Sequence, residues 1–185
     1  MSVITAVEPG SLSLALPPGF HVLAAHDPAA VDAFDETDLD EAGRAWLAQV
    51  RATSAASDAL LCAVHAETWQ GEIAHASLVV TARSFDDDPD LALAALRRYA
   101  LENTSTSGQV VALSLPLGQA VGSADLVFLG EERVPTGLVE VQVVEASTCT
   151  VIQLTLCTPR PPLLSAYAAM TADIAAQLSL DAGVD

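Results

Sequence analysis

Hydrophobic and polar positions repeat along the chain with two different periods. From Ser11 to Leu16 they alternate with a period of two, which is typical of a half-buried strand. Apolar residues recur at helical spacing in three longer segments, from Leu39 to Val50, from Leu91 to Leu101 and from Leu164 to Leu178. This spacing predicts three helices that each bury one face.

Strand-like segments lie mostly in pairs between the predicted helices. They are His21–Leu23, Leu60–Trp69, Ile73–Phe85, Val110–Leu115, Gln119–Leu129, Leu138–Val144 and Thr148–Cys157. Hairpin-length connections between them imply a largely antiparallel sheet with the helices packed on it. We therefore predict an α+β fold with six to eight strands and about three helices. The fold is expected to be one domain spanning residues 1–185, with residues 1–8 and 181–185 loose at its ends.

Polar residues and proline mark the expected starts of the helices. Thr37 or Asp38 is placed to cap the first helix. Asp88 followed by Pro89 predicts the start of the second helix, because proline is well tolerated at the first helical position. Thr158 is placed to cap the last helix.

The composition is that of one domain with a sizeable core, because 51% of the 185 residues are hydrophobic and only 17% are charged. The charge is strongly one-sided: 24 acidic residues stand against seven arginines, and the formal net charge is −17. A surface of this charge repels phosphate backbones and anionic lipids. We therefore expect neither nucleic acid nor a membrane among the partners.

The start of the chain lacks the pattern of a signal peptide, because Glu8, Pro9, Gly10 and Pro17 interrupt its apolar residues. No apolar run reaches the roughly 18 residues that a membrane-spanning helix needs. We accordingly expect a cytoplasmic protein.

Three cysteines, Cys62, Cys149 and Cys157, have no C-x-x-C spacing. An odd number without such spacing predicts reduced, buried thiols rather than a disulfide or a metal site.

Several turn and cap residues carry a resemblance to a known family. They are the segments Leu16–Phe20, Leu115–Gly118, Val139–Val143, Leu154–Pro159 and Ile174–Leu178. Over most of its length the chain resembles the PsbP-like fold family, and within it small actinobacterial proteins of the LpqN-like type. The resemblance implies an α/β/α sandwich around an antiparallel sheet, used for docking to partner proteins. It also implies an accessory role near type VII secretion systems, and it brings no catalytic residues.

Histidines in the first predicted hairpin raise the question of a metal site. His65-Ala66-Glu67 matches the first half of the zinc-deaminase signature, but no Pro-Cys-x-x-Cys segment follows it. His65 and His75 would face each other across a three-residue loop and would lie on opposite faces with a two-residue loop. The sequence identifies no third ligand in either case. We therefore predict no metal site and no cofactor.

The segment from Asp27 to Glu41 carries seven acidic residues and no basic one. Two explanations stay open: a solvated face, or a docking surface for a partner with a basic surface. The docking surface would be centred on Asp32, Asp35, Glu36, Asp38, Asp40 and Glu41.

Three hypotheses for the function follow. The first is a non-enzymatic, acidic protein-interaction module that works as an accessory or adaptor. The second is a small-ligand-binding protein or a hydrolase with a site around His65, Glu67 and His75. The third is a homo-oligomeric structural protein.

Overall fold

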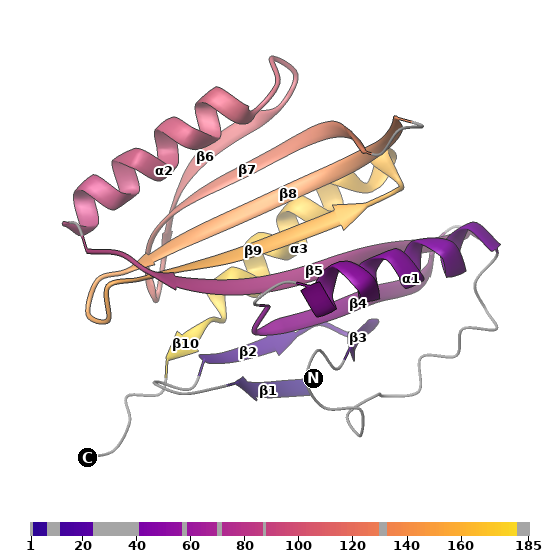
Figure 1. Ribbon diagram of the computed structural model, residues 1–185, viewed down its shortest axis with the longest axis horizontal. Helices are drawn as coiled ribbons and strands as arrows, with labels where there is room; N and C mark the ends of the chain where they lie inside the picture. Colours follow the sequence, from indigo (N-terminus) through magenta and orange to yellow (C-terminus); the bar gives the residue numbers. More distant parts are fainter. Residues whose placement is uncertain are drawn as a thin grey trace.

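The computed structural model of the chain describes residues 2–6, 12–23, 41–56, 59–69, 72–86, 88–129 and 133–180. Within these ranges the chain forms two sheets (Figure 1). The larger has seven strands in the order β3-β4-β5-β9-β8-β7-β6, and the smaller has three in the order β1-β2-β10. All neighbouring strands are antiparallel.

The bounds of the elements are as follows. The strands are β1 (Ser2–Ala6), β2 (Leu12–Leu16), β3 (Phe20–Leu23), β4 (Leu61–Trp69), β5 (Glu72–Ser84), β6 (Gln109–Leu115), β7 (Gly118–Leu129), β8 (Val134–Glu145), β9 (Thr150–Thr158) and β10 (Ser179–Leu180). The helices are α1 (Glu41–Ala56), α2 (Pro89–Asn103) and α3 (Leu164–Ala176), with a short 3₁₀ turn, η3, at Pro161–Leu163.

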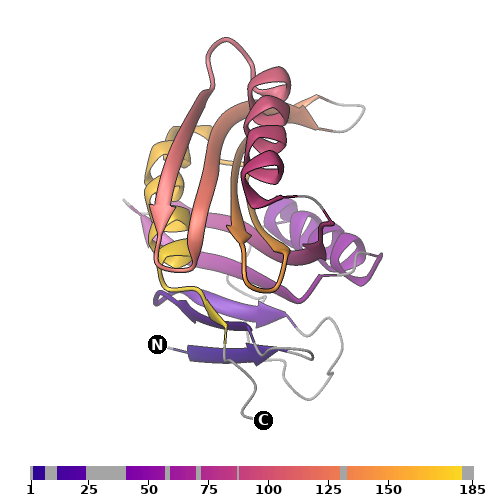
Figure 2. The same ribbon diagram turned by 90° about the vertical axis from the view of Figure 1, so that its left-hand side faces the viewer.

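The seven-stranded sheet lies between two layers of helices (Figure 2). Helix α3 covers one face, over β7, β8 and β9, while α1 and α2 lie on the other face. Helix α1 packs near the β4–β5 end of this face, and α2 packs near the β6–β7–β8 end. The predicted α+β class and the α/β/α sandwich are therefore confirmed, and the main sheet falls within the predicted six to eight strands.

Side-chain alternation along the strands divides the core into two clusters. On the α3 side, Leu78, Leu154 and Leu156 are fully buried in a cluster that includes Ile174 of α3. On the α1 side, a smaller cluster consists of Leu23, Leu47, Cys62 and Val64. Successive residues of a strand point to opposite faces, so one segment such as β4 contributes to both clusters.

The three-stranded sheet corrects the expectation for the N-terminus. Residues 1–8 were expected to be loose, but Ser2–Ala6 forms β1 and pairs with β2. Strand β2 buries Leu12, Leu14 and Leu16 in the core on the α3 side, so β1 lies beside a well-packed neighbour. Residues 181–185, also expected to be loose, lie outside the described residues.

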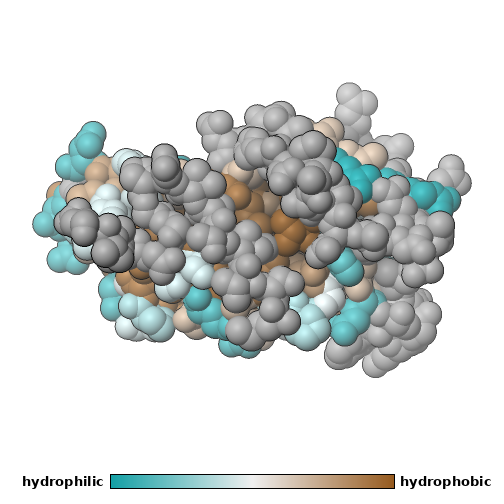
Figure 3. Space-filling view, turned by 90° about the horizontal axis from the view of Figure 1, so that it is seen from below, coloured by the Kyte–Doolittle hydropathy of each residue, from teal (hydrophilic) through white to brown (hydrophobic). Residues whose placement is uncertain are grey.

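The space-filling view from the side of the smaller sheet shows where polar residues lie there (Figure 3). Hydrophilic residues with a described placement are spread along the rim, and apolar surface is visible toward the middle. The described hydrophilic residues on this side therefore form no single continuous patch in this view.

The helix starts agree with the sequence in one case and differ in another. Asp88 caps α2 as predicted, because its Oδ1 accepts a hydrogen bond of 2.8 Å from the backbone nitrogen of Asp90. Thr158 does not cap α3 and the prediction was wrong: it ends β9 and donates to the backbone oxygen of His75 at 2.9 Å. The 3₁₀ turn at Pro161–Leu163 intervenes before α3 begins. The predicted caps of α1, Thr37 and Asp38, lie outside the described residues.

The cysteines are free thiols in three different settings. Cys62 is fully buried and Cys157 is partly buried, in line with the sequence-based expectation. Cys149 is exposed, so the expectation of a buried thiol was wrong there. It lies in the turn before β9 with φ of 51°, and this turn carries its side chain outside the sheet.

In the part of the chain that the structure describes, no helix has the length and apolarity to cross a membrane.

The connection between β6 and β7 depends on a close backbone approach. A Cβ atom added at Gly118 would lie 2.1 Å from the backbone oxygen of Val144 on β8. We predict that Gly118→Ala lowers the free energy of unfolding by about 2 kcal/mol or more, because a backbone atom cannot move aside cheaply. Urea denaturation of the purified variant measures this loss.

Gly122 on the same strand is the matched control. There the added Cβ would lie 3.1 Å from a side-chain methyl of Val111 and 3.2 Å from one of Leu113, and both can shift. Gly122→Ala is expected to lower the free energy of unfolding by less than about 1 kcal/mol. Equal losses in the two variants would contradict the assigned close contact.

Candidate functional site

The acidic docking surface expected from the sequence lies almost entirely outside the described residues. Asp32, Asp35, Glu36, Asp38 and Asp40 precede the first described residue of α1. Glu41 is that first residue, and its side chain is not described. The docking surface therefore stays a prediction from the sequence.

The β4–β5 hairpin decides how its two histidines are placed. Trp69 pairs with Glu72, so two residues connect the strands. In this register His65 lies opposite Ala76, and Ala66 lies opposite His75. Because neighbouring positions point to opposite faces, the two imidazoles lie on opposite faces of the sheet.

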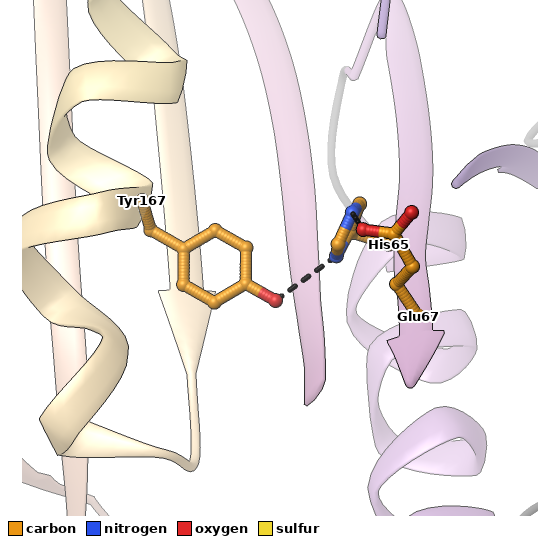
Figure 4. A network of polar contacts seen from close by, with 3 residues as sticks. All are labelled: His65, Glu67 and Tyr167. Carbon is orange, nitrogen blue, oxygen red and sulfur yellow. Dashed lines mark hydrogen bonds and ion pairs between the residues drawn. The ribbon is translucent and has the colours of Figure 1, made fainter. Parts of the chain in front are cut away.

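His65 forms a polar network on the α3 side of the sheet (Figure 4). Its Nδ1 atom lies 3.0 Å from the hydroxyl of Tyr167, which projects from α3. Its Nε2 atom lies 3.8 Å from Oε2 of Glu67, two residues along β4. The ring of Phe20 lies 4.9 Å from the imidazole, centroid to centroid, and His65 and Tyr167 are each only 3% exposed.

The turn before β3 closes this network from one side. Gly19 has φ of 85°, a conformation that favours glycine, and a Cβ added there would lie 2.9 Å from Nε2 of His65. The Pro17-Pro18-Gly19 turn therefore lies directly against the imidazole. Only a residue without a side chain fits at its third position.

Burial favours the uncharged forms of His65 and Tyr167. It lowers the pKa of His65 below 6.5, against the opposing effect of the Glu67 carboxylate. Burial and the charge of Glu67 raise the pKa of Tyr167 to about 12. A neutral imidazole hydrogen-bonded to a protonated tyrosine, both shielded from solvent, serves to fix α3 on the sheet.

His75 belongs to the opposite layer. It is 8% exposed, and its ring lies 4.8 Å from that of Trp46 on α1, centroid to centroid. The seven-stranded sheet therefore separates it from His65 and Glu67. The alternative site around His65, Glu67 and His75 was wrong, because it requires all three side chains on one face. No group of three His, Cys, Asp or Glu side chains within the described ranges could hold a metal ion.

A row of polar side chains lies on the helix α1 and α2 side of the sheet. Thr81 of β5 pairs with Gln153 of β9, which in turn pairs with Gln142 of β8. In the adjacent row, Glu140 of β8 pairs with Thr155 of β9. These positions alternate with the buried leucines and valines that point toward α3, so all of them face the other way.

Glu140 and Gln153 are joined by a hydrogen bond. Nε2 of Gln153 donates to Oε1 of Glu140 at 3.0 Å and to Oγ1 of Thr155 at 3.1 Å. Burial raises the pKa of Glu140, while the bond from Gln153 and the charge of Arg83 act in the opposite direction. The carboxyl group is therefore easier to protonate than an exposed glutamate.

Gln142 is the polar residue of this row with an unmet hydrogen bond. Its side chain is 5% exposed, and its Oε1 atom has no hydrogen-bond partner among the described residues. A buried acceptor left in this state costs about 1–3 kcal/mol. A buried acceptor in this state calls for a hydrogen-bond donor from outside the described chain, such as a water molecule or a ligand.

Helix α2 and the polar row together line an open cleft of about 420 Å³. The strands contribute Arg83, Glu140, Gln142 and Gln153, and α2 contributes Ala95, Leu96, Arg98 and Tyr99. Figure 1 shows α2 and α1 spaced apart over the sheet, with β8 and β9 running between them. We refer to this feature as the α2 cleft, and it is the candidate functional site.

Sequence reasoning missed the α2 cleft. In the sequence, Glu140 and Gln142 alternate with Val139, Val141 and Val143, which is the pattern of an ordinary half-buried strand. The signal that was available is the unusual run of polar residues at Glu140, Gln142, Gln153 and Thr155 on two predicted strands of one hairpin. Their assembly with Arg83 and α2 depends on long-range strand pairing, which the sequence pattern does not specify.

Comparison with known proteins supports the fold. No protein-family model matches the chain, and no curated protein matches it. Among solved structures, it is similar to LpqN of Mycobacterium tuberculosis, described as involved in cell envelope biogenesis. The TM-score is 0.55 at 12% sequence identity, over 97% of this chain and 89% of that chain. The chain therefore has an LpqN-like fold, and this likeness extends to the fold alone.

The buried His65 predicts a dependence of stability on pH. Its folded-state pKa is lowered, so below pH 6.5 the unfolded chain binds a proton that the folded chain does not. We predict that the free energy of unfolding falls as the pH drops below 6.5, by at most about 1.4 kcal/mol per pH unit. In His65→Gln this dependence disappears. Urea denaturation at a series of pH values measures it.

Glu145 provides an internal control for that experiment. Burial would raise its pKa, but hydrogen bonds from Thr148 and Ser147 outweigh burial and hold the pKa at about 2. Its contribution to stability is therefore lost only as the pH falls below 4.5, in wild type and variant alike. An unchanged dependence on pH near 6 in His65→Gln would show that His65 is not the group responsible.

Substitutions of the two neighbouring glutamines of the polar row are predicted to change the free energy of unfolding in opposite directions. Gln142→Met removes the unpartnered buried oxygen and is expected to raise the free energy of unfolding by about 1 kcal/mol. Gln153→Met removes the donor to Glu140 and Thr155, and is expected to lower it by about 1 kcal/mol. Urea denaturation compares the two. A loss of equal size in both variants would contradict the assignment of Gln142.

Proposed function

We propose that the chain is a non-catalytic binding protein that works as an accessory to another protein. The observation that carries this proposal is the distribution of reactive groups over the described residues. The buried imidazoles of His65 and His75 lie on opposite faces, each against an aromatic ring. The polar groups that line the α2 cleft are amides, guanidinium groups, a tyrosine hydroxyl and one carboxyl. These groups suit recognition, and no nucleophile and base stand together among them.

Charge supports a protein partner with a basic surface. The net charge of −17 favours encounter with a cationic surface and disfavours nucleic acid and anionic membranes. The acidic segment from Asp27 to Glu41 is the part of the sequence with the densest negative charge, and it is proposed as the docking surface. An electrostatic surface of this kind selects a partner by sign and needs no pocket.

The likeness to LpqN adds support by analogy of fold only. LpqN is described as involved in cell envelope biogenesis, and we propose a comparable accessory role for this chain. An association with a type VII secretion system and a cytoplasmic location both stay predictions from the sequence.

Self-association is the second candidate and rests on a specific observation. Phe128, Leu129 and Val134 are about half exposed at one end of the β7–β8 pair. Strand β6, an edge of the larger sheet, carries no charged residue. Uncharged edge strands favour pairing with another chain.

The acidic segment is tested by capture of a partner from a native lysate. We predict that the wild type captures a specific protein at low salt and about tenfold less at high salt, because the attraction is screened. A variant that converts Asp32, Asp35, Glu36 and Asp38 to their amides loses the captured protein at low salt. Quantitative mass spectrometry of the eluates measures the difference.

The control variant carries the same change of charge elsewhere. It converts the exposed Asp86, Asp90, Glu102 and Asp173 to their amides and is expected to retain the partner. If the amount of captured protein changes neither with the salt concentration nor in the variant of the acidic segment, this segment is not the docking surface.

A further inference from the structure

We propose that the α2 cleft binds a small organic anion that also carries a hydrogen-bond donor. The anionic group, a carboxylate or a phosphate, lies against the guanidinium groups of Arg83 and Arg98. The donor, a hydroxyl or amine, lies against Oε1 of Gln142. This proposal does not rest on the acidic segment, so the failure of either proposal leaves the other standing.

The two arginines make the α2 cleft unusual for this protein. Only seven basic residues are present in a chain of net charge −17, and two of them line this one cleft. Arg83 comes from β5 and Arg98 from α2, so they approach it from the sheet and from the helix. Among the described residues, no carboxylate lies within 4 Å of either guanidinium group. Both line the α2 cleft beside the carboxyl group of Glu140, and a guanidinium group can form charge-assisted hydrogen bonds with a carboxylate or a phosphate.

The floor of the α2 cleft requires a donor. Oε1 of Gln142 is buried and accepts no hydrogen bond from the described part of the chain. The neighbouring Nε2 of Gln153 is already committed to Glu140 and Thr155. A ligand hydroxyl or amine that reaches Gln142 removes the penalty of its unmet acceptor, so binding at this atom is favoured.

The dimensions and walls fit a small molecule. A volume of about 420 Å³ lies within the range of small-ligand sites, which is roughly 300–1,000 Å³. Ala95, Leu96 and the ring of Tyr99 supply an apolar wall on the helix side. Polyanions such as nucleic acids are excluded because the remaining surface repels them. The combination of two guanidinium groups, the carboxyl group of Glu140, one buried acceptor and an apolar wall fits a small, hydroxylated or aminated organic anion.

Isothermal titration calorimetry with three matched probes tests the proposal. Glycerol 2-phosphate and glycerate both carry an anionic group and hydroxyls, and they differ in the anion. Glycerol carries the hydroxyls alone. We expect at least one of the two anions to bind, with a dissociation constant of about 1 mM or lower, and glycerol not to bind. The stronger of the two anions identifies the phosphate or the carboxylate as the preferred group.

Two variants on the same helix assign the binding to the α2 cleft. Arg98→Gln is expected to weaken the binding of the anion about tenfold, because it removes a charged hydrogen bond. Arg97→Gln makes the same change of charge at a residue that does not line the α2 cleft, and is expected to leave binding unchanged. Gln142→Met is expected to weaken binding about fivefold by removing the acceptor for the hydroxyl. Circular dichroism confirms that each variant is folded.

Three results would overturn the proposal. The first is the absence of binding by both anions. The second is an equal loss in Arg97→Gln and Arg98→Gln, which would indicate attraction to the charge of α2 rather than a site. The third is unchanged binding in Gln142→Met, which would show that the ligand donates no hydrogen bond to Oε1 of Gln142.

Discussion

The pairing register of the larger sheet is the constraint on which the rest of this structure depends. Two residues connect β4 to β5, and this length places His65 opposite Ala76. One residue more would carry the side chains of one strand to the other face. The register therefore decides which side chains meet α3, which meet α1, and which are left between α1 and α2.

The two faces of the larger sheet therefore differ in polarity. The α3 face is a continuous apolar core that holds one neutral polar network, His65 with Tyr167. The opposite face is covered near its two ends, by α1 over β4 and β5 and by α2 over β6, β7 and β8. Polar residues of β5, β9 and β8 occupy the region beside α2. A polar row on a sheet face that is partly roofed by a helix is suited to binding, because it combines desolvation with hydrogen-bonding groups.

Local features of the fold could be predicted from the sequence. The strand-like segment Leu60–Trp69 and the helical spacing after Asp88-Pro89 both depend on neighbouring residues, and both predictions were confirmed by β4 and α2. The start of α3 could not be read in this way, because Thr158 forms its hydrogen bond with His75, which is 83 residues away in the sequence. Strand β1 was also missed, although its partner β2 is the next strand along the chain and Ala6 pairs with Leu12.

The α2 cleft could not be predicted from the sequence, because it is formed by residues that are far apart along the chain. Glu140 and Gln142 have the pattern of solvent-facing positions on an ordinary strand. Only the pairing of β8 with β9, and of β9 with β5, brings them to Gln153 and Arg83. For His65 and His75 the sequence allowed two pairing registers, one with both side chains on the same face and one with them on opposite faces. The two-residue connection between β4 and β5 selects the second register.

A crystal structure of the protein grown with glycerol 2-phosphate tests the central claim most directly, because it examines the register and the α2 cleft together. The account predicts a phosphate group between the guanidinium groups of Arg83 and Arg98, a ligand hydroxyl within hydrogen-bond distance of Oε1 of Gln142, and His65 and His75 on opposite faces of the sheet. An α2 cleft filled by the protein's own side chains, or both histidines on one face, would contradict it.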